Sequence, residues 1–412
     1  MTGRTLICGL LLLACGSSCS FLLRGKDAPL PPEPSYRDSL NYVITNDLSS
    51  LPELDHAIDS FMDFWSLHGV SLAITRHDSL LYAKGYGEAD AATPMTPGTT
   101  LRLASVSKLL TAVGIMRLQE EGKLFLDTPV FGPLGVLNKW DGYIRDDNYY
   151  LITVEHLLRH QGGFTARGGD PVFTPYPSLE GLLQKQLRRP LAFEPGSWQE
   201  YSNFGFLLLS LIIEQVSGMP YEQFMQEEVF TPALCRDFRI AGNYLWERHP
   251  GETRYYMQPD AEKTTSFDGR FTGVDKCYGG NNVTGSMGAG GWTASSIELA
   301  RLVCAIDGQG PLPDILSGES VRQMTTWFDP DTYSLGWNDT KPTGEWTRSG
   351  SFSGTQALVK VYPDGECWIL ISNTSAWRGS RFSNNIAVLF QDLRSRFSSQ
   401  LPQRDLFVEP GN

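Results

Sequence analysis

The stretch of residues 101–122 constrains the fold of this chain more than any other. Its apolar residues do not keep to one stripe but run nearly all the way round a helix. A helix that is apolar on every side is buried inside a domain. Gly122 is a typical C-terminal stop. The pattern therefore predicts a buried helix over about residues 105–121, around which the rest of the domain must pack.

The first turn of this predicted helix carries polar groups that a buried position makes reactive. Ser105 and Lys108 are three residues apart, so they share one face with Cβ atoms about 5–6 Å apart. Removal from water lowers the pKa of a lysine, which could then take a proton from a neighbouring hydroxyl. The amides of the helix N-terminus favour negative charge beside Ser105. The alternative is that Ser105 only caps the helix and Lys108 extends to water.

Length, composition and net charge restrict the class of protein. The chain has 412 residues, of which 41% are hydrophobic, and a net charge of −12. This is enough chain for a substantial core in one large or two closely packed domains. Net acidity without a basic run argues against nucleic acid as a partner. His156 and His160 share a helix face but have no further ligand nearby, so we predict structural roles for both, and no metal or cofactor.

The N-terminus has the features of an export signal. Arg4 precedes an apolar run over residues 6–14 that is too short to span a bilayer. Residues 12–15, Leu-Leu-Ala-Cys, resemble a bacterial lipobox, in which Cys15 would carry lipid; the alternative is an ordinary signal peptide cut near Ser18 or Ser20. Residues 1–14 are thus a predicted signal peptide, and residues 15–48 a polar, proline-bearing tether. We expect an exported, lipid-anchored protein of the bacterial cell envelope, with no other membrane contact.

The remaining elements predict an α+β fold. A β-hairpin over residues 70–85 precedes the buried helix, and three strands follow near the C-terminus, with most helices in between. This order indicates an antiparallel sheet flanked by terminal helices, with an inserted, mainly helical subdomain. The predicted domain covers residues 49–400, with its sheet part at about 49–100 and 295–400 and its helical part at about 101–294.

Three short motifs occur once each and in a fixed order: Ser105 to Lys108 as Ser-x-x-Lys, Tyr201 to Asn203 as Tyr-x-Asn, and Arg348-Ser349-Gly350. Their order and separations resemble the serine β-lactamase and penicillin-binding hydrolase superfamily. The phrases around them resemble the branch that holds class C β-lactamases, D-alanyl-D-alanine carboxypeptidases, D-aminopeptidases and esterases. They lie at residues 101–130, 152–164, 193–218, 290–302 and 348–363. The resemblance covers most of residues 49–395 and implies the β-lactamase/transpeptidase-like fold.

The resemblance also implies catalytic roles. Ser105 would attack a carbonyl and form an acyl-enzyme, while Lys108 and Tyr201 would share the proton transfers; which of these two is the general base stays open. Positive neighbours would favour ionisation of Tyr201. Asn203 could accept from Lys108 and donate to a substrate carbonyl.

The third motif would bind the substrate. The backbone N–H groups of Ser105 and Ser351 would form the oxyanion site, and Gly350 would let the substrate lie against the strand. Arg348 departs from the lysine usual in β-lactamases and carboxypeptidases, but it keeps the charge and can bind a carboxylate in bidentate fashion. We hypothesise that Arg348 and Arg167, with Ser349 beside them, bind an anionic substrate.

These features predict a monomeric serine hydrolase that acts on a small ester, amide or D-amino-acid peptide. Two alternatives remain: a penicillin-binding sensor module that acylates without turnover, and a true class C-like β-lactamase. The substrate would be a small molecule or a peptide, and no cofactor is required.

Overall fold

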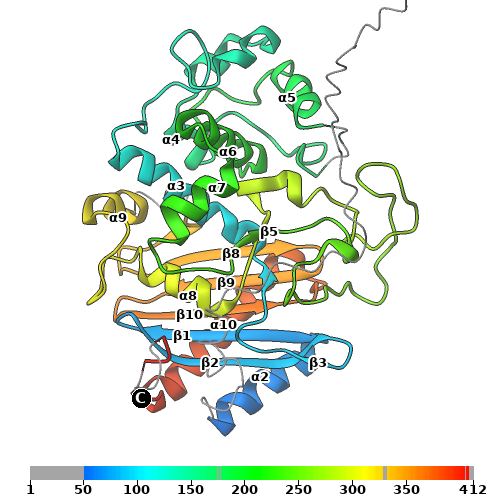
Figure 1. Ribbon diagram of the computed structural model, residues 1–412, viewed down its shortest axis with the longest axis vertical. Coiled ribbons are helices and arrows are strands. Elements are labelled where there is room, and N and C mark those ends of the chain that lie inside the picture. Colours follow the sequence, from blue (N-terminus) through cyan, green and yellow to red (C-terminus); the bar gives the residue numbers. More distant parts are fainter. Residues whose placement is uncertain (1–50, 174–175, 177, 328–331, 404, 408–412) are drawn as a thin grey trace, which may run out of the picture.

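The structure is a computed structural model that describes residues 51–173, 176, 178–327, 332–403 and 405–407 (Figure 1). The predicted signal peptide, the lipidation site Cys15 and the tether over residues 15–48 lie outside the described residues.

An antiparallel seven-stranded sheet forms one half of the molecule. Its strand order is β3-β2-β1-β10-β9-β8-β7. Strands from the two ends of the chain meet at its centre, where Val70 in β1 pairs with Ser372 in β10. The strands are β1 (Gly69–Arg76), β2 (Ser79–Asp90), β3 (Thr93–Pro94), β7 (Asp339–Thr340), β8 (Trp346–Phe352), β9 (Thr355–Val361) and β10 (Glu366–Ser372). The prediction of an antiparallel sheet built from both ends of the chain is confirmed.

Helices cover both faces of this sheet. The terminal helices α2 (Pro52–Trp65) and α10 (Phe382–Phe397) pack on one face, and α8 (Ser296–Cys304) packs on the other (Figure 1). The period-two alternation of a strand decides which side chain goes where. In β1, Leu72 and Ile74 join the core under the terminal helices, whereas Ala73 joins the core on the opposite face.

The second half is mainly helical and lies against the α8 side of the sheet (Figure 1). Its helices are α3 (Ser107–Glu120), α4 (Val154–Leu158), α5 (Leu179–Leu187), α6 (Asn203–Ser217), α7 (Tyr221–Met225) and α9 (Gly318–Thr325). The sequence did not predict α7 and α9, nor a small second sheet of β4 (Leu101–Arg102), β6 (Trp292–Ala294) and β5 (Arg239–Ile240). Helical turns complete the part: η1 (Ala104–Val106), η2 (Asn138–Tyr143), η3 (Asp147–Leu151), η4 (Gln226–Phe230), η5 (Leu245–Glu247) and η6 (Thr284–Ala289); η7 (Gly379–Arg381) and η8 (Ser398–Gln400) flank α10.

The central helix α3 is buried on all sides, as its sequence predicts. Only Arg117, Gln119 and Glu120, near its C-terminal end, are not fully buried. Helix α6 packs against it and is also apolar over most of its length. The Ser202 side chain caps the start of α6, and Gly218, in the left-handed conformation, ends it. These two buried helices hold the Ser-x-x-Lys and Tyr-x-Asn motifs at their adjacent N-terminal ends.

Two further features concern the described residues as a whole. None of their helices alone has the length and apolar composition to cross a bilayer; α6 taken together with residues 221–230 passes that test, but the pair bends by 79°.

The four cysteines in the described part of the chain are free and buried: Cys235, Cys277, Cys304 and Cys367.

Candidate active site

Ser105 lies in the η1 turn that leads into α3. The preceding residue, Ala104, has a φ of 49°, a left-handed conformation that is uncommon for a residue with a side chain. The N-cap of α3 is Val106, with no side-chain cap, so the Ser105 hydroxyl does not serve as a helix cap. The sharp turn instead presents this hydroxyl to the groups described next.

Lys108 is completely buried beneath Ser105. Its Nζ lies 3.2 Å from Ser105 Oγ and donates to Asn203 Oδ1 at 2.6 Å and to the carbonyl of Ala289. Burial holds the pKa of Lys108 well below its ordinary value, and the nearby Arg348 guanidinium adds to this effect, which the Asp170 carboxylate partly opposes. The alternative in which this lysine extends to water is therefore wrong.

Tyr201 approaches Ser105 from the other side. Its hydroxyl donates to Ser105 Oγ at 2.6 Å, and its ring packs 4.5 Å from the buried ring of His160. Burial raises the pKa of Tyr201, although the positive charge of Arg348 acts in the opposite direction. Arg348 alone would lower the pKa of Tyr201, as expected for a positive neighbour. Burial has the larger effect, so the net change raises the pKa. Tyr201 is thus a protonated phenol at neutral pH.

Asn203 is fixed by two charged neighbours. Its Oδ1 accepts from Lys108, and its Nδ2 donates to Asp170 Oδ2 at 2.7 Å. Asp170 therefore engages one of the two N–H groups of this amide, and the other is the donor left for a substrate carbonyl. The N-cap of α6 is the preceding residue, Ser202, so Asn203 does not cap the helix.

Arg348 lies behind Ser105 and does not contact solvent. Its side chain is 0% exposed. Nε donates to the backbone carbonyl of Ser105 at 2.8 Å, and Nη2 donates to the same oxygen. The arginine therefore positions the turn that carries Ser105 and adds positive charge to the buried network.

The edge of β8 faces the turn that carries Ser105. A Cβ on Gly350 would meet the carbonyl oxygen of Leu103 at 2.3 Å, so only glycine allows this approach. The Ser349 N–H donates to Asn338 Oδ1 at 2.6 Å, away from β9. Backbone N–H groups two residues apart point to the same edge of a strand. The Ser351 N–H thus points to this open edge, beyond the end of β7.

The side chains around Gly350 differ in direction. The Ser349 hydroxyl donates to Asn338 Oδ1 at 3.2 Å, and the Ser351 hydroxyl accepts from Gln356 at 3.1 Å. At the end of the strand, the Phe352 ring packs edge-on against Phe173 at 5.3 Å. This contact joins the loop over residues 163–200 to β8 just past Ser351.

Arg167 stays apart from the buried network. Its side chain is exposed and makes no hydrogen bond or ion pair to a described residue; only its backbone N–H is engaged, by Thr165 Oγ1 at 3.0 Å. The structure therefore does not bring Arg167 and Arg348 together as one anion site, because Arg348 is sealed behind Ser105.

Four residues complete the network without having been predicted: Asp170, His160, Tyr333 and Ala289. Ring contacts join Tyr333 to both His160 and Tyr201, and the Ser202 N–H donates to His160 Nδ1 at 3.0 Å. Burial holds the pKa of His160 well below its ordinary value. The available signals were the glycine-rich residues 288–291 and the closeness of His160 to the Gly162-Gly163 pair in the sequence, but neither specifies a contact. Among the described residues, no cluster of three metal-ligating side chains exists.

Comparison with known proteins agrees with this geometry. The family model described as Beta-lactamase matches residues 54–393. A putative D-alanyl-D-alanine carboxypeptidase of Escherichia coli O157:H7 is 28% identical over 329 residues, covering 71% of this chain and 72% of the relative. Esterase EstB of Burkholderia gladioli is 32% identical over 199 residues, covering 45% of this chain and 50% of the relative.

A solved structure supports the fold. The D-amino acid amidase of Ochrobactrum anthropi SV3, complexed with L-phenylalanine amide, superimposes with a TM-score of 0.66 at 21% identity, covering 84% of this chain and 99% of that one. The chain belongs to the β-lactamase family, and as a member of it the protein is a serine hydrolase. The fold class predicted from the sequence is confirmed.

Proposed function

We propose that Ser105 is the nucleophile of an acyl-enzyme mechanism and that Lys108, in its neutral form, is the general base. The observation that carries this proposal is the convergence of two groups on one oxygen: Lys108 Nζ at 3.2 Å and the Tyr201 hydroxyl at 2.6 Å from Ser105 Oγ. Both lie within the reach that proton transfer requires.

The hydrogen bonds of Lys108 support its role as base. A neutral amine has two N–H donors and one lone pair. The two donors are engaged by Asn203 Oδ1 and the Ala289 carbonyl, which leaves the lone pair directed at Ser105. Burial disfavours the ammonium form, so the neutral form is accessible near neutral pH.

The proton then has a complete route. Ser105 Oγ forms a bond to the substrate carbonyl carbon while its proton moves to Lys108. The negative charge on the carbonyl oxygen is stabilised by the N–H groups of Ser105 and Ser351. When the carbon–leaving-group bond breaks, Tyr201 gives its proton to the leaving group and is reprotonated from Lys108. Water then attacks the carbonyl carbon of the acyl-enzyme, and the same groups transfer protons in the reverse order, so that the acid is released and Ser105 is regenerated.

For the substrate we propose a small ester, amide or D-amino-acid peptide. The relatives named as a D-alanyl-D-alanine carboxypeptidase and an esterase support this range. The guanidinium of Arg348 donates to the Ser105 carbonyl and is shielded from solvent, so it is not accessible to the carboxylate of a β-lactam. We therefore favour esters and amides over β-lactams.

For the location we propose export and lipid attachment at Cys15. The support is the charged, apolar and small-residue order of residues 4–15. In a bacterial host given an alkyne-bearing fatty acid, the wild-type protein should become labelled and sediment with membranes. A Cys15→Ser variant that is labelled and sedimented to the same extent would contradict this proposal.

The catalytic proposal is tested by steady-state kinetics with p-nitrophenyl acetate, a D-alanyl amide and nitrocefin. We expect multiple turnovers of the ester or amide, with slower turnover of nitrocefin. Tyr201→Phe should lower kcat by about 10²–10⁴-fold, the usual contribution of a proton-transfer group. One stoichiometric burst without further turnover would instead indicate a sensor module, and fast nitrocefin turnover a β-lactamase.

A further inference from the structure

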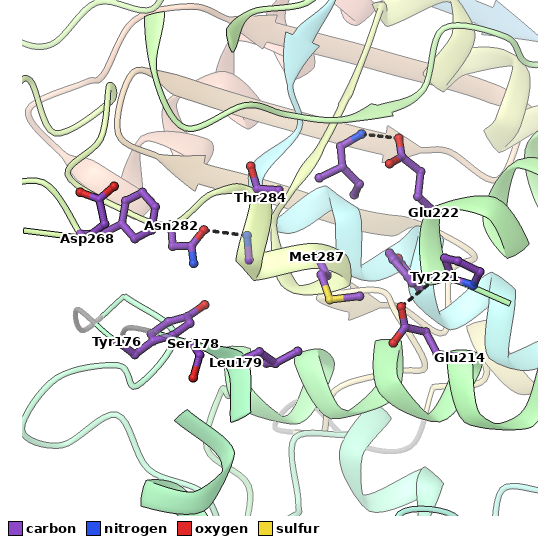
Figure 2. Close-up of a pocket in the computed structure, with 14 residues that line it drawn as sticks. Tyr176, Ser178, Leu179, Glu214, Tyr221, Glu222, Asp268, Asn282, Thr284 and Met287 are labelled. Atoms are coloured by element: carbon purple, nitrogen blue, oxygen red, sulfur yellow. Dashed lines mark hydrogen bonds between the residues drawn. The ribbon is translucent and has the colours of Figure 1, made fainter. Parts of the chain in front are cut away.

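A pocket on the helical side of the molecule lies outside the buried network around Ser105. It has a volume of about 360 Å³, within the range of small-molecule sites. Its walls come from the start of α5, the end of α6, the start of α7, the η6 turn and the loop that includes Asp268 (Figure 2). None of the residues that contact Ser105 lines it.

Two carboxylates occupy one side of this pocket. Figure 2 shows Glu214 and Glu222 on that side, with Tyr176 and Asp268 at the opposite end. Each glutamate is held by a backbone N–H that donates to its Oε1: Tyr221 to Glu214 and Ile240 to Glu222, both at 2.9 Å. These bonds fix the orientation of each carboxylate and leave its second oxygen, Oε2, free to accept.

The charge of these two glutamates is not balanced within the described part of the chain, where neither forms a salt bridge. Asp268, by contrast, is paired with Arg270 through its Oδ2 at 2.5 Å. Among the residues that the structure describes, no lysine, arginine or histidine lines the pocket. A ligand with a positive charge would therefore gain a charge-assisted hydrogen bond at either carboxylate.

The rest of the lining is apolar with a few polar groups. Leu179, Pro220, Ile240 and Met287 supply hydrophobic surface between the two ends. At the far end, the Tyr176 hydroxyl is buried, with the residue 8% exposed, and makes no hydrogen bond of normal geometry to a described residue, although it lies beside Asn282. A buried hydroxyl without such a bond is a group that a ligand can satisfy.

We propose that this pocket is a binding site for a small primary amine with an apolar body. The ammonium group would donate to Glu214 or Glu222, the apolar part would lie along Leu179 and Met287, and a polar end would reach Tyr176. Because none of these residues belongs to the reaction centre, binding does not depend on the catalytic proposal.

The test compares 2-phenylethylammonium with the neutral 2-phenylethanol, which has nearly the same shape. Binding is measured by isothermal titration calorimetry on the full-length protein carrying Ser105→Ala, so that catalysis plays no part. We expect the amine to bind with a dissociation constant at least about ten-fold below that of the alcohol, the value of one charge-assisted hydrogen bond.

Matched variants separate the effect of the pocket charges on amine binding from effects on the fold and on the net charge. Glu214→Gln with Glu222→Gln keeps both oxygens that accept the backbone N–H groups but removes both charges, and should weaken amine binding by about ten-fold or more. Glu53→Gln with Glu227→Gln changes the net charge equally at exposed positions outside the pocket and should leave binding unchanged. Equal binding of amine and alcohol, no binding of the amine, or equal effects of the two double variants would overturn the proposal.

Discussion

The Nε atom of Arg348 donates a 2.8 Å hydrogen bond to the backbone carbonyl of Ser105, across a separation of 243 residues. The arginine that resembles a substrate-binding lysine in sequence thus acts on the nucleophile's own backbone. Two consequences follow: it positions the turn that presents Ser105, and its charge helps to keep Lys108 neutral.

Replacement of Arg348 should separate these two effects. Arg348→Met removes both the hydrogen bonds and the charge, and displacement of the Ser105 turn should lower kcat by about ten- to a hundred-fold. Because the Arg348 charge lowers the pKa of Lys108, its loss should raise that pKa and move the acidic limb of kcat/KM to higher pH. Arg348→Lys keeps the charge and should leave the acidic limb of kcat/KM at its wild-type pH. If the limb lies at the same pH in both variants, the Arg348 charge does not lower the pKa of Lys108.

Replacement of Asp170 should move the same limb in the opposite direction. The Asp170 carboxylate raises the pKa of Lys108 and accepts from Asn203 Nδ2. Asp170→Asn keeps an oxygen for Asn203 but removes the charge, so the limb should move to lower pH. The measurement is the pH profile of kcat/KM for a neutral ester. A limb that moves upward or stays in place would argue against Lys108 as the titrating base.

Gly350→Ala should destabilise the protein as well as inactivate it. The added Cβ would lie 2.3 Å from the Leu103 carbonyl oxygen, a backbone atom that cannot move aside alone. We expect a loss of about 3 kcal/mol in the free energy of unfolding, measured in urea. The control is Gly142→Ala, where an added Cβ meets nothing within 4 Å. A loss at Gly350 no larger than at Gly142 would contradict the close contact between β8 and the turn.

His160 should make the protein less stable in acid. Its folded-state pKa lies well below the value of about 6.5 expected when unfolded. The unfolded chain therefore binds this proton first, so its contribution to stability is complete above about pH 6.5 and is lost as the pH falls towards the folded-state pKa, by up to about 1.4 kcal/mol per pH unit. The difference in unfolding free energy between wild type and His160→Gln should shrink over this range. A difference independent of pH would mean that His160 is not held neutral.

Much of the fold could be predicted because its strongest signals are local. The all-round apolar pattern of α3 and the alternating strands of the hairpin over residues 70–85 each specify an element without reference to the rest. Short elements such as β5 and β6 could not be predicted, since two or three residues carry no period of their own and depend on neighbours distant in the chain.

The three sequence motifs of the candidate site could be predicted to lie together, but not all their contacts and not the four further residues of the network. The spacing of Ser105 and Lys108 on one helix sets their approach directly. The direction of Arg348 depends on which face of β8 meets the Ser105 turn, and the partner of Asn203 depends on the path of a loop that carries Asp170. Both are tertiary facts that no local pattern encodes.

The most direct test is to identify the residue that an active-site reagent modifies covalently. The protein is treated with a fluorophosphonate, digested and sequenced by mass spectrometry, with Ser105→Ala as the control and Ser107→Ala as the neighbouring match. The account predicts one modified peptide, labelled at Ser105, that is absent in Ser105→Ala and retained in Ser107→Ala. Equal labelling of the Ser105→Ala variant at another residue would contradict it.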